Sequence, residues 1–179
     1  QATSLYAKTK MAAETLIREQ AKRYHIIQPS VVFGKEDNFF NQFSTLARYL
    51  PALPLIGGGH TLFCPVYVYD VVDAIIALIE QAPANATYAA CGPEITSFKN
   101  ILRYILNITA RKRPLIPLPF AIARLQAYLM NTVGIYLLTP DQVDLLQYDN
   151  INHQQHPNID ALIPMMHPYK AIVPSYINQ

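Results

Sequence analysis

The chain has 179 residues, of which 51% are hydrophobic and 15% are charged, and its formal net charge at pH 7 is +2. This length suits one domain or two small interlocked ones, and the apolar content excludes a disordered chain. There is no basic stripe with interleaved aromatic residues, which excludes a nucleic-acid-binding surface. We expect no signal peptide and no transmembrane segment, because no apolar run is long enough to cross a bilayer.

The first predicted helix contains a pair of residues suited to proton transfer. Thr3 or Ser4 can cap this helix, which is expected to run to about Arg23. Tyr6 and Lys10 are four residues apart and therefore share one helical face. An ammonium beside a phenol can lower the pKa of the phenol by about 1–3 units, toward the range of efficient proton transfer. The alternative is a tyrosine on the buried edge of an amphipathic helix, with a solvated lysine one turn later.

Residues 24–34 predict a strand, because this stretch is short, rich in β-branched residues and bounded by Gly34. Its lack of alternation is typical of a strand buried on both faces of a parallel sheet. Pro29 has no N–H to donate, so the pairing is expected to be interrupted there. A helix over about 38–49 follows. Residues 57–59, three glycines, lead into extended sequence and not into a helix, so they predict a turn or hairpin and not a phosphate loop.

Two further short strands are predicted over residues 64–68 and 87–91. Each contains one of the two cysteines, Cys64 and Cys91, which we expect to be buried free thiols in a reducing compartment. Asp70 is expected to cap a strongly apolar helix that runs to about residue 81.

The rest of the chain is predicted to be mainly helical. Thr96 or Ser97 can cap a helix to about residue 109, and Pro140 opens a helix to about residue 148. Residues 120–138 predict one long or two short helices; a core helix is favoured, and an interfacial helix that touches a membrane or a partner is the alternative. The tail is expected to wrap the surface in short turns, with apolar anchors at Ile159, Leu162, Ile163, Val173 and Tyr176.

Two other groups of polar residues are not interpreted as sites. His153 and His156 lack an accompanying set of cysteines or carboxylates, so a solvated tail is favoured and no metal site is predicted. Asp70 and Asp73 are interpreted as a helix cap and a first-turn charge, not as paired catalytic carboxylates. Helices that alternate with short buried strands together predict an α/β fold with a parallel sheet.

An ordered series of segments resembles the C-terminal half of the extended or atypical short-chain dehydrogenase/reductase superfamily, which includes nucleotide-sugar epimerases and dehydratases. Residues 6–10 resemble the Tyr-x-x-x-Lys helix of that superfamily, and residues 28–34 resemble the strand that follows it. Residues 57–59 with 65–74, and then 88–94, resemble the next helix and strand.

This resemblance implies the distal half of a doubly wound parallel, Rossmann-like sheet with a smaller, mainly helical substrate-side region. Residues 1–92 would form an incomplete dinucleotide-binding domain, with 35–67 contributing to the substrate side, and 93–179 would form the helical region and tail. The glycine-rich dinucleotide fingerprint is expected upstream, in a longer polypeptide. We therefore expect weak or no dinucleotide binding by this chain alone. We also expect an unpaired edge on strand 26–33, and therefore either association through that edge or through an exchanged element, or a missing partner fragment.

The resemblance also implies roles for individual residues. Tyr6 would be the proton donor or acceptor, and Lys10 would lower its pKa and bind the nicotinamide ribose of NAD or NADP. Pro29, Ser30 and Val31 would pack against the nicotinamide end. Gln28 stands where the superfamily usually has arginine, and the third catalytic residue would lie upstream. The implied function is that of an NAD(P)-binding oxidoreductase or epimerase acting on a small molecule of unknown identity.

Within the superfamily, residues 36–41, 117–120 and 173–177 resemble the branch that contains the nucleotide-binding accessory subunit of respiratory complex I. This resemblance implies an alternative function, as a non-catalytic dinucleotide-binding accessory or assembly protein. Such a protein would associate peripherally with a membrane complex, in the cytoplasm of a bacterium or in the mitochondrial matrix of a eukaryote.

Overall fold

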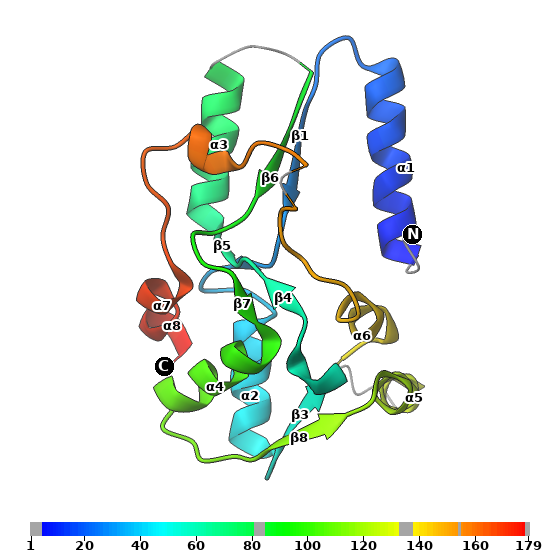
Figure 1. Ribbon diagram of the computed structural model, residues 1–179, viewed down its shortest axis with the longest axis vertical. Helices are drawn as coiled ribbons and strands as arrows, with labels where there is room; N and C mark the ends of the chain where they lie inside the picture. The colour runs from blue at the N-terminus through cyan, green and yellow to red at the C-terminus, as the bar shows by residue number, and fades with distance from the viewer. Residues whose placement is uncertain (1–4, 81–84, 133–137, 154, 178–179) are drawn as a thin grey trace.

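The computed structural model describes residues 5–80, 85–132, 138–153 and 155–177, and the predicted α/β fold is confirmed (Figure 1). The helices are α1 (Leu5–Gln20), α2 (Phe40–Tyr49), α3 (Val68–Glu80), α4 (Phe98–Ile108), α5 (Phe120–Thr132), α6 (Pro140–Leu145), α7 (Tyr169–Ile172) and α8 (Pro174–Ile177), with 3-10 turns η1 (Gly57–Gly59) and η2 (Ile159–Ala161). The strands are β1 (His25–Pro29), β2 (Val32–Phe33), β3 (Leu53–Ile56), β4 (Leu62–Phe63), β5 (Val66–Tyr67), β6 (Ala86–Ala90), β7 (Thr96–Ser97) and β8 (Leu115–Leu118). The predicted caps Thr3 and Ser4 lie outside the described residues.

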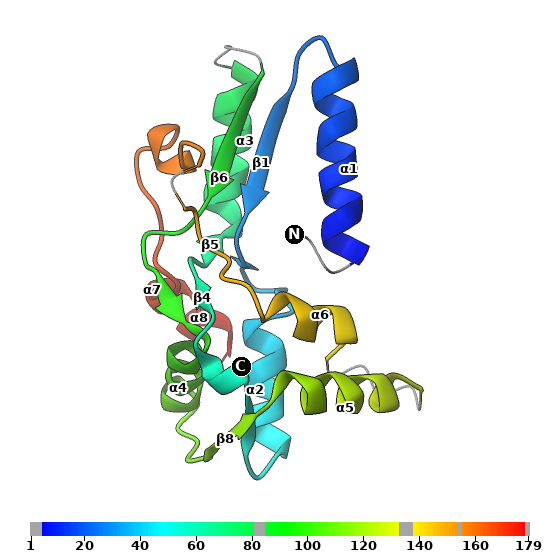
Figure 2. The same cartoon turned by 45° about the vertical axis from the view of Figure 1, so that its right-hand side comes forward.

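The strands form pairs that are mostly parallel. β1 pairs with β6, β2 with β5 and β3 with β8 in parallel, whereas β4 and β7 are antiparallel. Pro29 still pairs with Ala90 at the end of β1, so the expected interruption of the pairing at Pro29 is not observed; a second short strand begins at Val32 and pairs with β5. Figures 1 and 2 show α3 on one side of the β1–β6 pair and α1 on the other, beside β1.

The outer edge of β1 is unpaired in the part of the chain that the structure describes, as expected. Ser30 donates its N–H to the carbonyl oxygen of Ala90, just beyond the end of β1. Because successive N–H groups along a strand alternate in direction, the N–H of Ile27 points away from β6, toward this outer edge.

Two apolar clusters hold the elements together. The larger one is rich in aromatic side chains and lies between α2, α4 and the C-terminal helices; its phenylalanines are Phe33, Phe40, Phe43, Phe63 and Phe98. The smaller one joins α3 and β6 to the tail through Val66, Ala74, Ala90, Ile159 and Ile163. The buried side chains of the tail thus confirm the predicted apolar anchors.

Several helix boundaries follow the predicted capping residues. The Ser97 hydroxyl accepts a hydrogen bond from the backbone N–H of Asn100 and caps α4. Thr139 and Gln142 form a capping box at the start of α6, with Pro140 in the first turn. Gly57–Gly59 form a tight turn in which all three φ angles are positive, a conformation that glycine adopts without strain.

The prediction that residues 120–138 form a core helix is wrong for α5, the described part of that stretch. Over residues 120–129 of this helix, the buried side chains are the small ones of Ala123 and Ala127, whereas four large apolar side chains are each more than half exposed: Ile122, Leu125, Tyr128 and Leu129. The apolar residues of α5 surround the helix, so the sequence pattern did not distinguish a buried face from an exposed one. No helix among the described residues is long and apolar enough to cross a membrane.

The cysteines are buried as expected, but the prediction that they are free thiols is wrong. Cys64 and Cys91 form a disulfide between positions 27 apart in the sequence. The fold brings them together because Cys64 precedes β5 and Cys91 follows β6, and the N–H of Gly92 donates to the Cys64 carbonyl oxygen.

Asp70 does not cap α3, because that helix begins two residues earlier, at Val68. The Asp70 carboxylate is almost fully buried and accepts a hydrogen bond from the backbone N–H of His167, whose Nδ1 lies 2.6 Å from the other oxygen. Asp70 therefore fastens the tail to the first turn of α3, a long-range contact that the local sequence pattern does not contain.

Candidate functional site

Four of the five predicted site residues line one cavity of about 580 Å³. Tyr6 reaches it from α1, Pro29 is the last residue of β1, and Ser30 and Val31 follow between β1 and β2. Ligands of open α/β sheets bind outside the carboxyl ends of the strands, and this volume is within the usual range for small-molecule pockets. The Tyr6 side chain is 55% exposed, so it is not packed into the interior.

Lys10 lies next to Tyr6 but does not line the cavity. Its Nζ is 5.6 Å from the centre of the Tyr6 ring, so the predicted proximity of the two side chains on one helical face is present. The Lys10 ammonium thus lies beside the Tyr6 ring, whereas the cavity is lined by Tyr6 together with Pro29, Ser30 and Val31.

The helix that carries Tyr6 and Lys10 is attached to β1 by a polar contact. The side-chain amide nitrogen of Gln28 donates to both carboxylate oxygens of Glu14, at 3.1 and 2.9 Å. Glu14 lies one turn beyond Lys10 on the same face of α1. Gln28 thus helps to set where α1 stands relative to the cavity.

Ser30 is held from three directions. Its N–H donates to Ala90, its hydroxyl donates to the carbonyl oxygen of Asn150 at 2.7 Å, and it accepts a hydrogen bond from the N–H of Cys64 at 3.2 Å. The side chain is 7% exposed. These bonds fix the Ser30 hydroxyl inside the wall of the cavity, with both of its hydrogen-bonding roles satisfied by the protein.

Sequence reasoning missed the opposite wall of the cavity. Asn38 contributes an amide side chain from just before α2, and Gln42 contributes one from its first turn. The end of α6 and the segment after it contribute Leu145, Leu146, Tyr148, Asp149 and Asn150. Two amide side chains near the start of the helix predicted over about 38–49 are a signal that could have been used. Asp149 is the one charged residue among those lining the cavity, and its carboxylate accepts a hydrogen bond from the N–H of Leu62.

The residues present fit the nicotinamide end of a dinucleotide better than its diphosphate. Pro29–Val31 and Tyr6 supply an apolar and hydroxyl-bearing wall, as the resemblance implies. The turn at Gly57–Gly59 is not a phosphate cradle, because the ring of Phe120 occupies the position that a Cβ on Gly57 would take. It also leads into β4 and not into a helix N-terminus.

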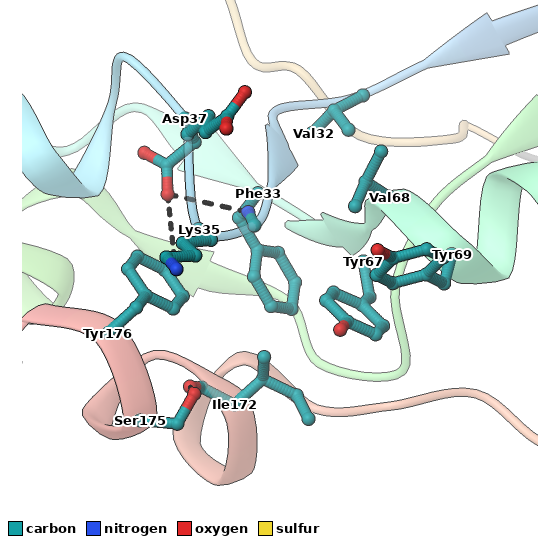
Figure 3. A pocket seen from close by; sticks show the side chains of 12 residues that line it. Val32, Phe33, Lys35, Asp37, Tyr67, Val68, Tyr69, Ile172, Ser175 and Tyr176 are labelled. Atoms are coloured by element: carbon teal, nitrogen blue, oxygen red, sulfur yellow. Dashed lines mark hydrogen bonds between the residues drawn. The ribbon is translucent and has the colours of Figure 1, made fainter.

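A second hollow, of about 610 Å³, contains none of the predicted site residues and shares only Val32 with the first (Figure 3). Figure 3 shows Tyr67 and Tyr69 on one side of it and Tyr176 with Lys35 on the other. The Tyr176 hydroxyl donates to Asp37 at 2.6 Å, and burial together with this carboxylate raises the pKa of Tyr176. This bond fastens α8 to the loop that leads into α2.

Comparison with known proteins places the chain in a family. Residues 1–127 match the family described as the RmlD substrate binding domain. The mitochondrial NADH dehydrogenase [ubiquinone] 1 alpha subcomplex subunit 9 of Arabidopsis thaliana is 30% identical over 155 residues, which cover 80% of this chain and 39% of that protein. The subunit of the same name from Mus musculus is 32% identical over 161 residues, which cover 87% of this chain and 42% of that protein. The chain therefore spans less than half the length of these relatives.

A solved structure shares the fold. The dTDP-4-dehydrorhamnose reductase from Bacillus anthracis, in complex with NADP, has a TM-score of 0.60 to this chain over 97% of this chain and 52% of that one, at 17% identity. The family match covers residues 1–127, well over half of the 179 residues. The chain thus belongs to the RmlD substrate binding domain family, within the NAD(P)-binding epimerase/dehydratase superfamily that its sequence resembles.

Proposed function

We propose that this chain supplies the acid–base helix and the substrate side of an NAD(P)-binding oxidoreductase or epimerase. One observation carries the proposal: Tyr6 lines the same cavity as Pro29, Ser30 and Val31, at the carboxyl end of β1. Tyr6 is the proton donor or acceptor. Its exposed phenol can exchange a proton with a substrate hydroxyl or carbonyl in the cavity.

The neighbouring residues hold the reacting groups. Lys10 adds positive charge beside the Tyr6 ring and binds the ribose of the nicotinamide nucleotide. Pro29, Ser30 and Val31 hold the nicotinamide end, and Asn38, just before α2, offers hydrogen bonds to a polar substrate together with Gln42 of α2. A bound NAD or NADP supplies or accepts a hydride; the contribution of this chain is to orient the substrate and to move the proton at the Tyr6 oxygen.

Different ranges of the polypeptide are assigned to dinucleotide binding and to the substrate side. Residues 1–92 belong to the dinucleotide-binding part, 93–179 to the substrate side, and 35–67 reach across to the latter. The packing of α2 against α4 and the pairing of β3 with β8 support the assignment of 35–67. The diphosphate of the cofactor is held by a first half of the kind that the longer relatives contain.

A second function is favoured by the names of the relatives. Two of them are mitochondrial NADH dehydrogenase [ubiquinone] subunits, which supports a non-catalytic, dinucleotide-binding accessory or assembly role at the surface of a membrane complex. In that case Tyr6 and Lys10 contact a structural cofactor, and the protein is located in the mitochondrial matrix or in the cytoplasm of a bacterium.

The variant Tyr6→Phe distinguishes the two functions. It is made in this chain joined to a first half, with Tyr49→Phe, an exposed tyrosine on α2, as the matched control. Nucleotide-linked sugars of the kind named for the structural neighbour are the first substrates to assay. Loss of turnover with cofactor affinity retained, and no loss in Tyr49→Phe, supports the enzyme. No turnover in any form, with unchanged assembly into the respiratory complex, supports the accessory role.

Calorimetry tests the cofactor assignment. NAD(H) and NADP(H) are titrated into the 179-residue chain and into the form joined to a first half. We expect binding only in the joined form. Micromolar binding to the 179-residue chain would contradict the assignment of the diphosphate site to the first half.

A further inference from the structure

The disulfide lies directly behind the wall of the Tyr6 cavity. Cys64 is 1% exposed and Cys91 is 8% exposed, and their Cα atoms are 5.0 Å apart. The N–H of Cys64 donates to the Ser30 hydroxyl, and the N–H of Ser30 donates to Ala90, the residue before Cys91. Ser30 is therefore bonded to the segments that carry both cysteines.

Ser30 connects the two cysteine-bearing segments to the cavity. Its hydroxyl donates to the carbonyl oxygen of Asn150, and both Ser30 and Asn150 line the cavity that contains Tyr6. The segment after Asn150 is itself fixed to the cysteine region, because Asn158 accepts from the Cys91 N–H and donates to the Cys91 carbonyl oxygen. A change at the disulfide thus has a short path of hydrogen bonds to two residues of the site.

Of the two cysteines, only Cys91 lines a cavity among those found in the described part of the chain. A small cavity of about 140 Å³ is lined by Cys91 and Ser30, together with His153 and His156 of the tail, whereas Cys64 does not line it.

We propose that Cys64–Cys91 is a reversible thiol-exchange site, opened by attack of a dithiol reductant on Cys91. A thiolate of the reductant bonds to Cys91 Sγ, the Cys64–Cys91 bond breaks, and Cys64 leaves as a thiolate. The second thiol of the reductant then attacks the reductant sulfur that is bonded to Cys91. Cys91 leaves as a thiolate, and the reductant departs as a disulfide. Two electrons pass to the protein, and the two protons of the dithiol end on the two cysteines.

Opening this bond removes the covalent link between the Cys64 segment and the end of β6, where the Gly92–Cys64 backbone hydrogen bond remains, and it loosens the hydrogen bond that Cys64 donates to Ser30. The wall of the Tyr6 cavity is then less rigid, so the oxidised form binds the nicotinamide end more tightly. This consequence rests on the proposed function; the exchange chemistry does not.

Single cysteine variants of the 179-residue chain test the site of attack. Cys64→Ser leaves Cys91 as a thiol, and Cys91→Ser leaves Cys64, so each thiol can be reacted alone with 5,5′-dithiobis(2-nitrobenzoic acid). We expect Cys91 to react about tenfold faster than Cys64, because access controls the rate. Equal rates, or a faster Cys64, would overturn the assignment of Cys91. Circular dichroism of both variants shows whether they are folded.

The unmodified chain tests the bond and its link to the site. After oxidation with diamide we expect no cysteine to be alkylated, and after dithiothreitol we expect both to be; two reactive thiols after diamide would refute the proposal. On reduction the amide resonances of Ser30 and Asn150 should shift, whereas that of Thr109, at the end of α4, should not. Unchanged resonances at Ser30 and Asn150 would refute the link to the cavity.

Cofactor titration separates this inference from the proposed function. In the form joined to a first half, we expect the oxidised protein to bind dinucleotide about fivefold more tightly than the reduced one, the effect of one net hydrogen bond. Equal affinity in both redox states would refute the coupling but not the function. Absence of binding in both states would refute the function, while the alkylation results would still stand.

Discussion

Gln28 on β1 and Glu14 on α1 form the contact that places the Tyr6–Lys10 helix against the sheet: the Gln28 amide nitrogen lies 3.1 and 2.9 Å from the two Glu14 carboxylate oxygens. The apolar residues Met11, Leu16 and Ile17 of α1 are exposed, so burial contributes little to holding this helix. Arg18 lies 3.5 Å from Glu14, one turn further along. The partner of Glu14 on β1 is thus a neutral amide, and the positive charge beside Glu14 comes from Arg18 on α1 itself.

Replacement of Gln28 should release α1. We expect Gln28→Ala to lower the free energy of unfolding by about 1–2 kcal/mol, because hydrogen bonds to a charged group are lost. Hydrogen exchange of the α1 amides should become faster, as measured by mass spectrometry. Gln20→Ala, an exposed position on the same helix, is the control, and Gln28→Arg should keep α1 protected. Unchanged exchange in Gln28→Ala would show that other contacts hold the helix.

Ser30→Ala should destabilise the cavity wall. The variant leaves the N–H of Cys64 and the carbonyl oxygen of Asn150 without their partner, and an unsatisfied buried group costs about 1–3 kcal/mol. Urea denaturation measures the change in the free energy of unfolding. Ser44→Ala on α2 is the control, because no hydrogen bond of the Ser44 hydroxyl is found within the described residues. A loss of unfolding free energy no larger than that of Ser44→Ala would mean that the hydrogen bonds of Ser30 do not stabilise the cavity wall.

Alkaline pH should weaken the fold through Tyr104. Burial, together with Tyr169 and Glu94, raises the pKa of Tyr104 to about 12, whereas its ordinary value is 10.0. The unfolded chain therefore loses this proton first, so the stabilising effect is complete below pH 10 and declines as the pH rises from 10 to 12. In Tyr104→Phe we expect a flatter decline over this range.

The same variant should be less stable at pH 8, by about 1 kcal/mol, because the Tyr104 hydroxyl donates to the carbonyl oxygen of Lys170. Thermal unfolding at several pH values gives both quantities, with Tyr49→Phe as the exposed control. If stability declines above pH 10 as steeply in Tyr104→Phe as in the parent protein, the pKa of Tyr104 is not raised in the folded state.

The chain should associate with itself through the outer edge of β1. Sedimentation velocity at high concentration is expected to show dimers or larger species, because an unpaired strand edge pairs with another chain. Ile27→Pro removes an outward N–H while leaving the pairing with β6, so it should reduce association. Leu125→Lys changes the exposed apolar face of α5 and should not. If only Leu125→Lys dissociates the species, α5 is the interface; a monomer at all concentrations would refute association.

Much of the local structure was predictable because its causes act over a few residues. Ser97 caps α4 three residues from its partner, and Gly57–Gly59 adopt positive φ angles. The spacing of Tyr6 and Lys10 likewise brings the two side chains together on any helix. For these features the sequence contains both the residue and the group on which it acts.

The tertiary structure decided where these pieces meet. Whether α5 is buried depends on what packs against it, and its apolar residues on all sides did not specify a face. The pairing of Cys64 with Cys91, the Gln28–Glu14 contact and the wall around Asn150 each join segments that are far apart in the chain. Such contacts depend on how the parallel strands order themselves, which is fixed by the packing of the whole chain and not by any short stretch of it.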